Sequence, residues 1–452
     1  MPRVFFGVRS AGCTLWKVVG SVLLWPRRRR GGLAWSLFAS VVALLSFAAA
    51  SGFASNPLNS NDRTTLASQA ACVAGDRNDF NLVPIVGGTS DVGIGAGEFS
   101  NLARIGRGVD PYVWNIETAG FISFKLVSGH IIIPYQDLYA KLTVPRFLGS
   151  LSRLEIRPSY TWESTLGYYG MGNAAPATPA GAADSFNQYG RLHPAIDAVE
   201  RWPLVDHVAL LAGARYTQSW LQIPAGSKLA QDLRFGSSEV RGLIGPTGPG
   251  AVALLSYGVQ WDNRDSEVSS HRGSFDEAQI RLSPGGSGMF PYRYGQGSLI
   301  TRLFLPISGE RVTLALRAVG DILFGSPPFY ELSRFDDSYA LGGLDGVRGI
   351  PAQRYYGKVK VFGNIEIRDR IVSFHALGKP LILGSVVFFD GGRVWADTAA
   401  QPALDGTGLG LKYGVGGGLR LESGETFVLR ADVAWSPDAR PIGAYFSAGQ
   451  TF

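Results

Sequence analysis

Apolar and polar residues alternate along most of this chain, from about residue 81 to its end. In the segment 358–368, apolar side chains fall on one face of an extended chain and charged or amide side chains on the other: Val359, Val361, Ile365 and Ile367 against Lys358, Lys360, Asn364, Glu366 and Arg368. Segments 409–421 and 427–435 repeat this alternation. A period of two is typical of a β-strand whose two faces meet different surroundings. The pattern therefore predicts an all-β fold.

The alternation predicts strands at residues 80–88, 91–101, 118–128, 137–145, 152–164, 189–204, 207–223, 250–264, 273–285, 294–308, 312–326, 357–372, 380–395, 408–421, 425–437 and 443–452. The number of these segments is even, as single-chain bacterial barrels require, and several segments are long enough to cross a bilayer at a tilt. We expect a 16-stranded antiparallel transmembrane β-barrel of the outer-membrane type over residues 81–452.

The connections between these segments alternate in length. One set includes tight turns, at 205–206, 309–311 and 423–424, and the other includes long loops, at 165–188, 224–249, 327–356 and 396–407. Outer-membrane barrels have short periplasmic turns and long outer loops. The alternation therefore places both ends of the barrel on the periplasmic side. The connection 102–117, on the short-turn side, is longer than this rule predicts.

Composition favours a membrane barrel over a soluble β-protein. Charged residues make up 17% of the chain and hydrophobic residues 46%, and the mean hydropathy is +0.09. This is too polar for many spanning helices, whereas alternating strands can be half polar and still line a lumen. A soluble propeller should show a blade repeat of about 40–50 residues, and the sequence shows none.

The first residues indicate a targeting segment. A basic cluster, Arg27–Arg30, precedes an apolar run from Leu33 to Ala50, and small residues follow. Residues 1–54 therefore resemble a signal peptide, with an uncleaved helical anchor as the alternative. These residues hold seven cations and no acid, which leaves 35 Lys and Arg against 36 Asp and Glu in the remainder. The net charge of +6 is thus a targeting feature and indicates no nucleic-acid partner. The polar residues 55–80 resemble a periplasmic linker.

The chain offers little catalytic chemistry. Its five histidines show no metal-ligand spacing, and the glycines around residue 95 are not followed by a helix, which a phosphate-binding loop needs. Removal of the signal segment would leave Cys72 as a single cysteine, so no intrachain disulfide is expected. We expect no enzymatic activity, no cofactor and no metal.

Two motifs near residue 350 carry a family resemblance. The loop sequence Leu341-Gly342-Gly343 with Val347-Arg348-Gly349-Ile350, and the strand sequence from Phe388 to Trp395 with Asp390 and Gly392, resemble the paired motifs of the BamA/TamA outer-membrane superfamily. That superfamily includes bacterial surface antigen barrels and two-partner secretion transporters. Ile350 departs from the aromatic residue that is usual there. Phe452 resembles the C-terminal signal read by the outer-membrane insertion machinery.

The resemblance implies a place and a role. The place is the bacterial outer membrane, with membrane lipid as a partner and the insertion machinery needed for the chain's own assembly. The role is assistance in inserting or translocating a client polypeptide or lipid. The alternative is a passive pore or structural surface barrel. Assembly factors of this superfamily carry periplasmic POTRA domains, which residues 55–80 are too few to form, so we expect a barrel-only form.

The long loop 327–356 is expected to fold into the lumen. A loop of that length without its own core is either functional or disordered. Val347, Arg348 and Gly349 are expected to anchor it, with Arg348 meeting Asp390, because the guanidinium fork can bind a carboxylate through two parallel hydrogen bonds. Missing side chains beside Asp390 leave room for the approach. Glu366 on the neighbouring strand is the alternative partner.

Overall fold

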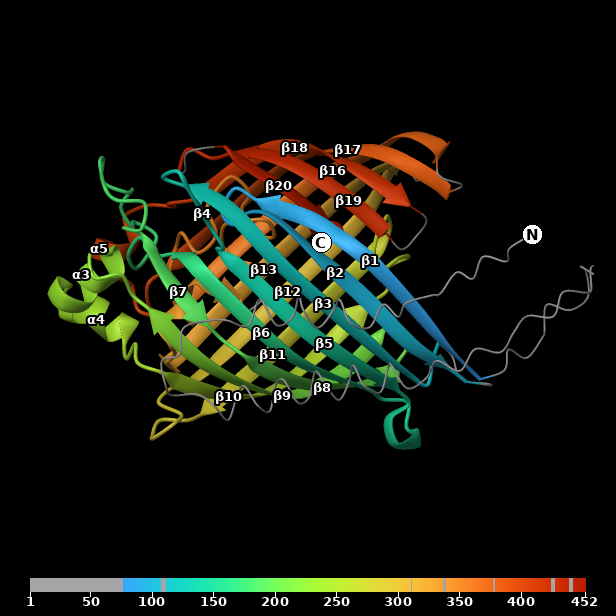
Figure 1. Ribbon diagram of the computed structural model, residues 1–452, viewed down its shortest axis with the longest axis horizontal. Helices are drawn as coiled ribbons and strands as arrows, with labels where there is room; N and C mark the ends of the chain where they lie inside the picture. The colour runs from blue at the N-terminus through green and yellow to red at the C-terminus, as the bar shows by residue number, and fades with distance from the viewer. Residues whose placement is uncertain are drawn as a thin grey trace, which may run out of the picture. The chain divides into compact units, whose positions relative to one another are not determined.

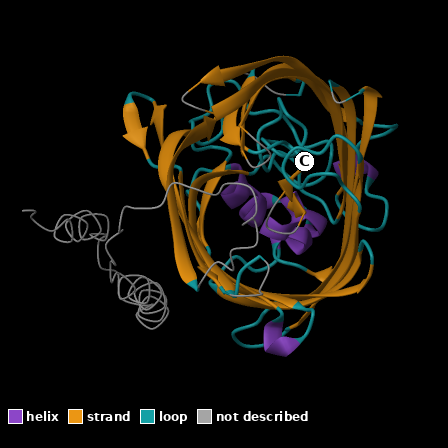
Figure 2. Cartoon of the chain, turned by 90° about the vertical axis from the view of Figure 1, so that its right-hand side faces the viewer, coloured by secondary structure: helices purple, strands orange, loops and turns teal. Residues whose placement is uncertain are grey.

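Alternating strands close into a transmembrane-type β-barrel, confirming the predicted fold (Figures 1 and 2). The structure is a computed structural model that describes residues 76–452 except 107–110, 310, 336–338, 377–378, 424–426 and 439–441. The expected signal peptide and nearly all of the expected linker lie outside the described residues. Strand β1 begins at Arg77, slightly before the barrel boundary expected at residue 81.

The barrel wall contains 16 strands within the described residues. They are β1 (Arg77–Thr89), β2 (Gly93–Ile105), β3 (Trp114–Val127), β5 (Tyr135–Pro145), β6 (Arg153–Gly167), the pair β7 (Gln188–Leu192) and β8 (Ala195–Val205), β9 (Val208–Gln222), β10 (Gly250–Asp262), β11 (Gly273–Pro284), β12 (Arg293–Ser308), β13 (Val312–Ser326), β16 (Val359–Ala376), β17 (Lys379–Trp395), β18 (Lys412–Ser423), β19 (Phe427–Trp435) and β20 (Gly443–Ala448).

One predicted strand is broken. The segment expected at 189–204 forms β7 and β8, which both pair with β6 and with β9. His193 and Pro194 separate the two pieces. Proline has no N–H to donate to the sheet, so a wall strand is interrupted there.

The connections sort to the two ends of the barrel. In Figure 1 the long loops gather at one end, with the outer helices α3 (Lys228–Phe235), α4 (Ser238–Ile244) and α5 (Pro402–Asp405). That end also holds β4 (His130–Ile132). The chain reaches η2 (Phe329–Ser333), β14 (Arg334–Phe335) and β15 (Tyr339–Ala340) before it enters β16. We assign the long-loop end to the cell exterior, because short turns face the periplasm in such barrels.

The two faces of the wall follow the predicted alternation. Exposed apolar side chains face outward, including Val361, Ile365, Ile367, Leu419 and Val433, while buried charged side chains line the lumen, including Lys360, Glu366, Arg368, Arg420, Arg430 and Asp432. Lys412 is half-buried, and so are Val359 and Leu429. Leu409 and Leu411 are exposed but precede β18. The side chain of Phe427 lies outside the described residues.

The last predicted strand is too long, and the structure corrects it. β20 ends at Ala448 rather than at Phe452. Gly449 has a φ of 88°, which a residue with a side chain rarely adopts, and the chain turns there into the barrel. Thr451 and Phe452 are buried, and the Phe452 ring packs against Phe304 with centroids 6.2 Å apart.

Candidate functional site

Glycines on the inner wall let the loop before β16 lie directly on it. A Cβ atom at Gly414 would stand 1.9 Å from the carbonyl oxygen of Arg348, and one at Gly392 would stand 2.6 Å from Leu341. Gly349 has a φ of 92°, and a Cβ atom there would stand 2.9 Å from the backbone of Trp435. Side chains at these positions would occupy the space that the loop needs.

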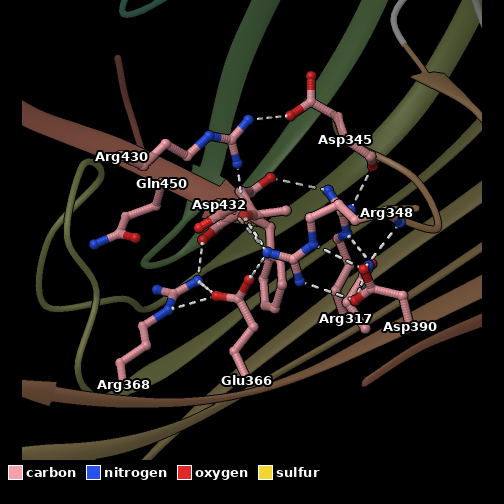
Figure 3. Close-up of polar contacts among 12 residues, drawn as sticks. Arg317, Asp345, Arg348, Glu366, Arg368, Asp390, Arg430, Asp432 and Gln450 are labelled. Atoms are coloured by element: carbon pink, nitrogen blue, oxygen red, sulfur yellow. Dashed lines mark hydrogen bonds and ion pairs between the residues drawn. The ribbon is translucent and has the colours of Figure 1, made fainter. Parts of the chain in front are cut away.

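Arg348 lies at the centre of the site, fully buried in the lumen (Figure 3). Its Nε donates to Oδ2 of Asp390 at 2.7 Å and its Nη2 to Oδ1 at 2.9 Å. This is the parallel two-bond geometry that only arginine provides. Nη1 donates to Asp432 at 3.2 Å. The same atom lies 2.7 Å from Oε1 of Glu366, as an ion pair outside hydrogen-bond geometry.

Further contacts fix the orientation of this arginine. Its guanidinium lies over the ring of Phe388, with 3.4 Å from the guanidinium carbon to the ring centroid, a favourable cation–π arrangement. The backbone N–H of Arg348 donates to Asp390 at 3.1 Å, and Asn364 donates to the other Asp390 oxygen at 2.7 Å. The N–H of Gly349 donates to the hydroxyl of Tyr445 at 2.9 Å. Side chain and backbone of the loop are therefore both held by the wall.

The chain segment after β20 joins the same network. The hydroxyl of Thr451 accepts from Nη1 of Arg348 at 3.2 Å and from Nη1 of Arg430 at 2.6 Å. Gln450 accepts from Nε of Arg420 at 3.1 Å, and the carbonyl of Phe452 accepts from Arg368 at 3.0 Å. The network thus links the loop, the wall strands and the segment that continues β20.

Strands β1 and β20 close the barrel through a short seam. All of β1 pairs with β2, from Arg77 to Thr89. With β20, only Gly88 pairs with Phe446 and Thr89 with Tyr445, extended by a hydrogen bond from Ser90 N to Ala444 O of 3.0 Å. The edge of β1 before Gly88 therefore has no β20 partner, although apolar side chains stand exposed along it: Phe80, Leu82, Val83 and Val86.

A cavity of about 620 Å³ adjoins the seam. Its lining includes Gly87 and Thr89 of β1, Phe446 and Ser447 of β20, and the loop segment 349–353. The arginine-anchored loop and the seam therefore border the same space.

The turn between β1 and β2 contacts the loop directly. The backbone N–H of Ala352 donates to Asp91 at 3.1 Å. Burial raises the pKa of the Asp91 carboxyl, while this hydrogen bond and the charge of Lys125 oppose the rise. One carboxylate thus connects the hairpin at the seam with the loop held by Arg348.

The identity of the fold family follows from comparison with known families. Residues 214–452 match the model of the Omp85 superfamily domain. The chain belongs to the Omp85 superfamily. This confirms the resemblance predicted from the two motifs and places the protein in the bacterial outer membrane.

Solved structures of other outer-membrane barrels resemble this one. The chain is similar to BamA from Haemophilus ducreyi lacking POTRA domains 1-3, with a TM-score of 0.56 and 14% sequence identity over 83% of this chain and 70% of that chain. CdiB from Escherichia coli matches with a TM-score of 0.51 and 12% identity, over 82% of this chain and 62% of that chain. At such identities the likeness concerns the fold. The chain spans less than two thirds of the CdiB chain. No curated protein matches it.

The sequence motifs located several members of the site. The structure packs Val347 against the wall residues Phe362 and Val394, and it places Arg348 on Asp390 and over Phe388. Gly349 bonds to Tyr445, and Gly392 leaves room for Leu341 of the same loop. Arg348 also lies beside Glu366, so it meets both expected partners, Asp390 and Glu366. Phe452 lies inside the lumen rather than at the end of a strand.

Other members of the site went unrecognised in the sequence. Asp432 falls on the polar face of the alternating segment 427–435, which we expect to line the lumen, but no motif assigns Asp432, Thr451, Tyr445 or Gly414 to the site. Alternating glycines in β18 were the available signal for a loop lying against that strand.

The described part of the chain has neither a metal-binding cluster nor a helix suited to span a membrane. No group of three or more His, Cys, Asp or Glu side chains there could hold a metal ion. Among the same residues, no helix is long and apolar enough to cross a membrane. Nor does the segment 76–452, as far as it is described, contain a POTRA domain.

Proposed function

We propose that this Omp85 barrel assists the insertion or translocation of a client polypeptide or lipid at the outer membrane, by opening laterally between β1 and β20. The short seam is the observation that carries the proposal. Two residue pairs hold β20 to β1, whereas β1 is paired with β2 along its whole length. Opening at the seam therefore breaks far fewer backbone hydrogen bonds than opening beside it.

The unpaired edge of β1 has the chemistry to receive a client. In lipid, each unsatisfied backbone N–H or C=O group costs several kcal/mol, so an open edge favours pairing with an added strand. Added strands gain affinity from main-chain hydrogen bonds, largely independent of sequence. A client polypeptide with exposed strand edges fits this edge, and the adjoining cavity provides space on the lumen side.

The lumen network supports the same proposal. A passive pore needs an open channel, but here the loop before β16 packs inside the barrel and buries Val347, Arg348 and Ile350 completely. The loop also contacts the turn between β1 and β2 through Asp91. These contacts suit a barrel whose seam and loop act together, without enzymatic chemistry. The outer-membrane insertion machinery is needed for the chain's own assembly, and the client is the further partner.

A reversible cross-link across the seam tests this function. In a background with Cys13→Ser and Cys72→Ser, the pair Ser90→Cys and Ala444→Cys joins β20 to the turn after β1, where the backbones are already hydrogen-bonded. The full chain is placed in phospholipid vesicles, and the folding rate of a urea-unfolded eight-stranded barrel is measured by gel shift. We expect the unlocked protein to accelerate folding, the oxidised protein to lose the acceleration, and reductant to restore it.

A matched cross-link controls for the disulfide itself. Ala278 and Leu299 stand opposite each other on the fully paired strands β11 and β12, and both side chains are exposed on the outer face. Ala278→Cys with Leu299→Cys should leave the acceleration unchanged. Equal acceleration by the locked and unlocked seam, or no acceleration by the unlocked protein, would contradict the proposal.

A further inference from the structure

The turn between β5 and β6 bears the most exposed large apolar side chains among the described residues. Leu148 is 89% exposed and Leu151 is 77% exposed. The turn contains the short 3-10 helix η1 (Phe147–Gly149). In Figure 2 this purple turn lies outside the ring of strands, below the wall, and Figure 1 shows it at the end opposite the long loops. It therefore bends away from the barrel axis, toward the space that the bilayer occupies.

The backbone of this turn is hydrogen-bonded within the turn. Phe147 N donates to Ser152 O at 3.0 Å, Gly149 N to Arg146 O at 3.0 Å, and Ser150 N to Phe147 O at 3.1 Å. The Ser150 hydroxyl also donates to Phe147 O at 2.8 Å. Backbone groups that enter a bilayer must be satisfied internally. The backbone N–H groups of Phe147, Gly149 and Ser150 all have acceptors within the turn.

The conformation of the turn directs Leu148 outward at an energetic cost. Arg146 has a φ of 55° and Leu148 a φ of 51°, a left-handed conformation that is uncommon in residues other than glycine. Such strain persists where other interactions compensate for it. Because Leu148 is almost fully exposed, packing within the barrel does not provide the compensation, whereas burial in lipid would.

The turn continues the lipid-facing surface of the wall. Val144 of β5 pairs with Leu154 of β6 just before the turn, on the face opposite the fully buried Thr143. The neighbouring hairpin adds Leu204 and Val205, 56% and 67% exposed. The Ser152 hydroxyl donates to Glu200 of that hairpin at 2.7 Å, which fastens the two hairpins together.

We propose that the β5–β6 turn is a membrane-binding element that inserts Leu148 and Leu151 into the periplasmic leaflet of the outer membrane. Phospholipid is the partner because the apolar patch is continuous with the lipid-facing band. The exposed Arg146 stands beside the two leucines, where its guanidinium can bind lipid phosphate while its stem lies along apolar surface. A periplasmic protein would instead be expected to meet side chains that point along the barrel axis.

Spin labels at single cysteines test this insertion. In the background with Cys13→Ser and Cys72→Ser, the full chain carries Leu148→Cys and is folded into vesicles of phosphatidylethanolamine and phosphatidylglycerol. Ile280→Cys, on the lipid face of β11, is the lipid reference, and Ala180→Cys, in an exposed outer loop, is the water reference. The measured quantity is the ratio of label accessibility to oxygen over accessibility to a water-soluble nickel complex.

We expect the label at residue 148 to match the lipid reference, with a ratio several-fold above that of the water reference. A ratio equal to that at residue 180 would overturn the proposal and leave the patch to a periplasmic protein. If Leu148→Cys fails to fold, as judged by gel shift, Leu151→Cys replaces it with the same two expected outcomes. The measurement does not depend on client insertion, so its result is separate from that of the seam experiment.

Discussion

Arg348 shows why one residue type occupies the centre of the lumen. It binds Asp390 through two parallel hydrogen bonds, approaches Asp432 and Glu366, and stacks on Phe388. Lysine could match the charge, but its single ammonium group cannot supply the fork or the flat stacking surface. Because the three carboxylates are buried, removal of the cation leaves negative charge in a region that water reaches poorly.

Replacement of Arg348 should therefore loosen the loop, and more so when both the charge and the hydrogen bonds are lost than when the charge is kept. Removing one member of a buried ion pair costs about 3–5 kcal/mol, so we expect Arg348→Ala to lower the temperature at which the folded gel band disappears and to expose residues 341–358 to proteinase K. Arg348→Lys should give an intermediate effect. Arg293→Ala, at an exposed arginine of β12, is the matched control. Unchanged protease resistance in Arg348→Ala would refute the anchoring role.

Only some residues of the site can be predicted from the sequence. The motifs nominated Arg348 and Asp390, and alternation put Asp432 and Arg430 on the lumen face. They could not indicate that Thr451 lies between Arg348 and Arg430. That contact depends on the bend at Gly449, which turns the chain after β20 into the barrel, and a terminal alternating segment gives no local signal for such a bend.

At the scale of elements, the period of two predicted the wall strands closely, because each strand separates lipid from lumen along its whole length. The alternation predicted the wrong strand ends where a single residue interrupts a strand within an alternating segment. Pro194 divides one strand into β7 and β8, and Gly449 ends β20 early. The seam could not be predicted either, because the number of β1–β20 pairs depends on register across the closing edge.

The glycines of β18 lead to a second prediction at this scale. A methyl group at Gly414 would meet the Arg348 carbonyl oxygen at 1.9 Å, so the loop must move. Overpacking of this kind typically costs about 1–3 kcal/mol. We expect Gly414→Ala to increase proteinase K cleavage within residues 341–358 while the barrel stays folded on a gel. At Gly320 on β13, the nearest atom to an added methyl group is 3.9 Å away, so Gly320→Ala should leave cleavage unchanged. Equal cleavage in the two variants would contradict the close approach at Gly414.

At the scale of the whole molecule, two groups of residues occupy the lumen. One is an aromatic cluster of the outer loops, and the other is the polar network around Arg348. Aromatic residues of the outer loops, including Tyr168, Phe329 and Tyr356, form a buried cluster with the helix α3. Deeper in the barrel, the loop and the segment after β20 meet at Arg348 and Thr451. A barrel of this width can hold a water channel, but loops and short helices lie inside the ring of strands in Figure 2. Buried side chains, including Tyr168, Phe329 and Arg348, occupy space between them.

This filled lumen predicts the electrical behaviour of the protein. In a planar lipid bilayer, the full chain should conduct little current, because ions need a continuous aqueous path and the loop packs across it. Deletion of residues 327–356, bridged by a short glycine and serine linker, should raise single-channel conductance severalfold. The current through the open channel should also fluctuate less than it does in the full chain. Removal of residues 179–182, in an exposed outer loop, controls for loop shortening and should not change the conductance. High conductance in the full chain, unaffected by loss of 327–356, would favour the passive-pore alternative over lateral opening, because the loop would then not limit passage through the barrel.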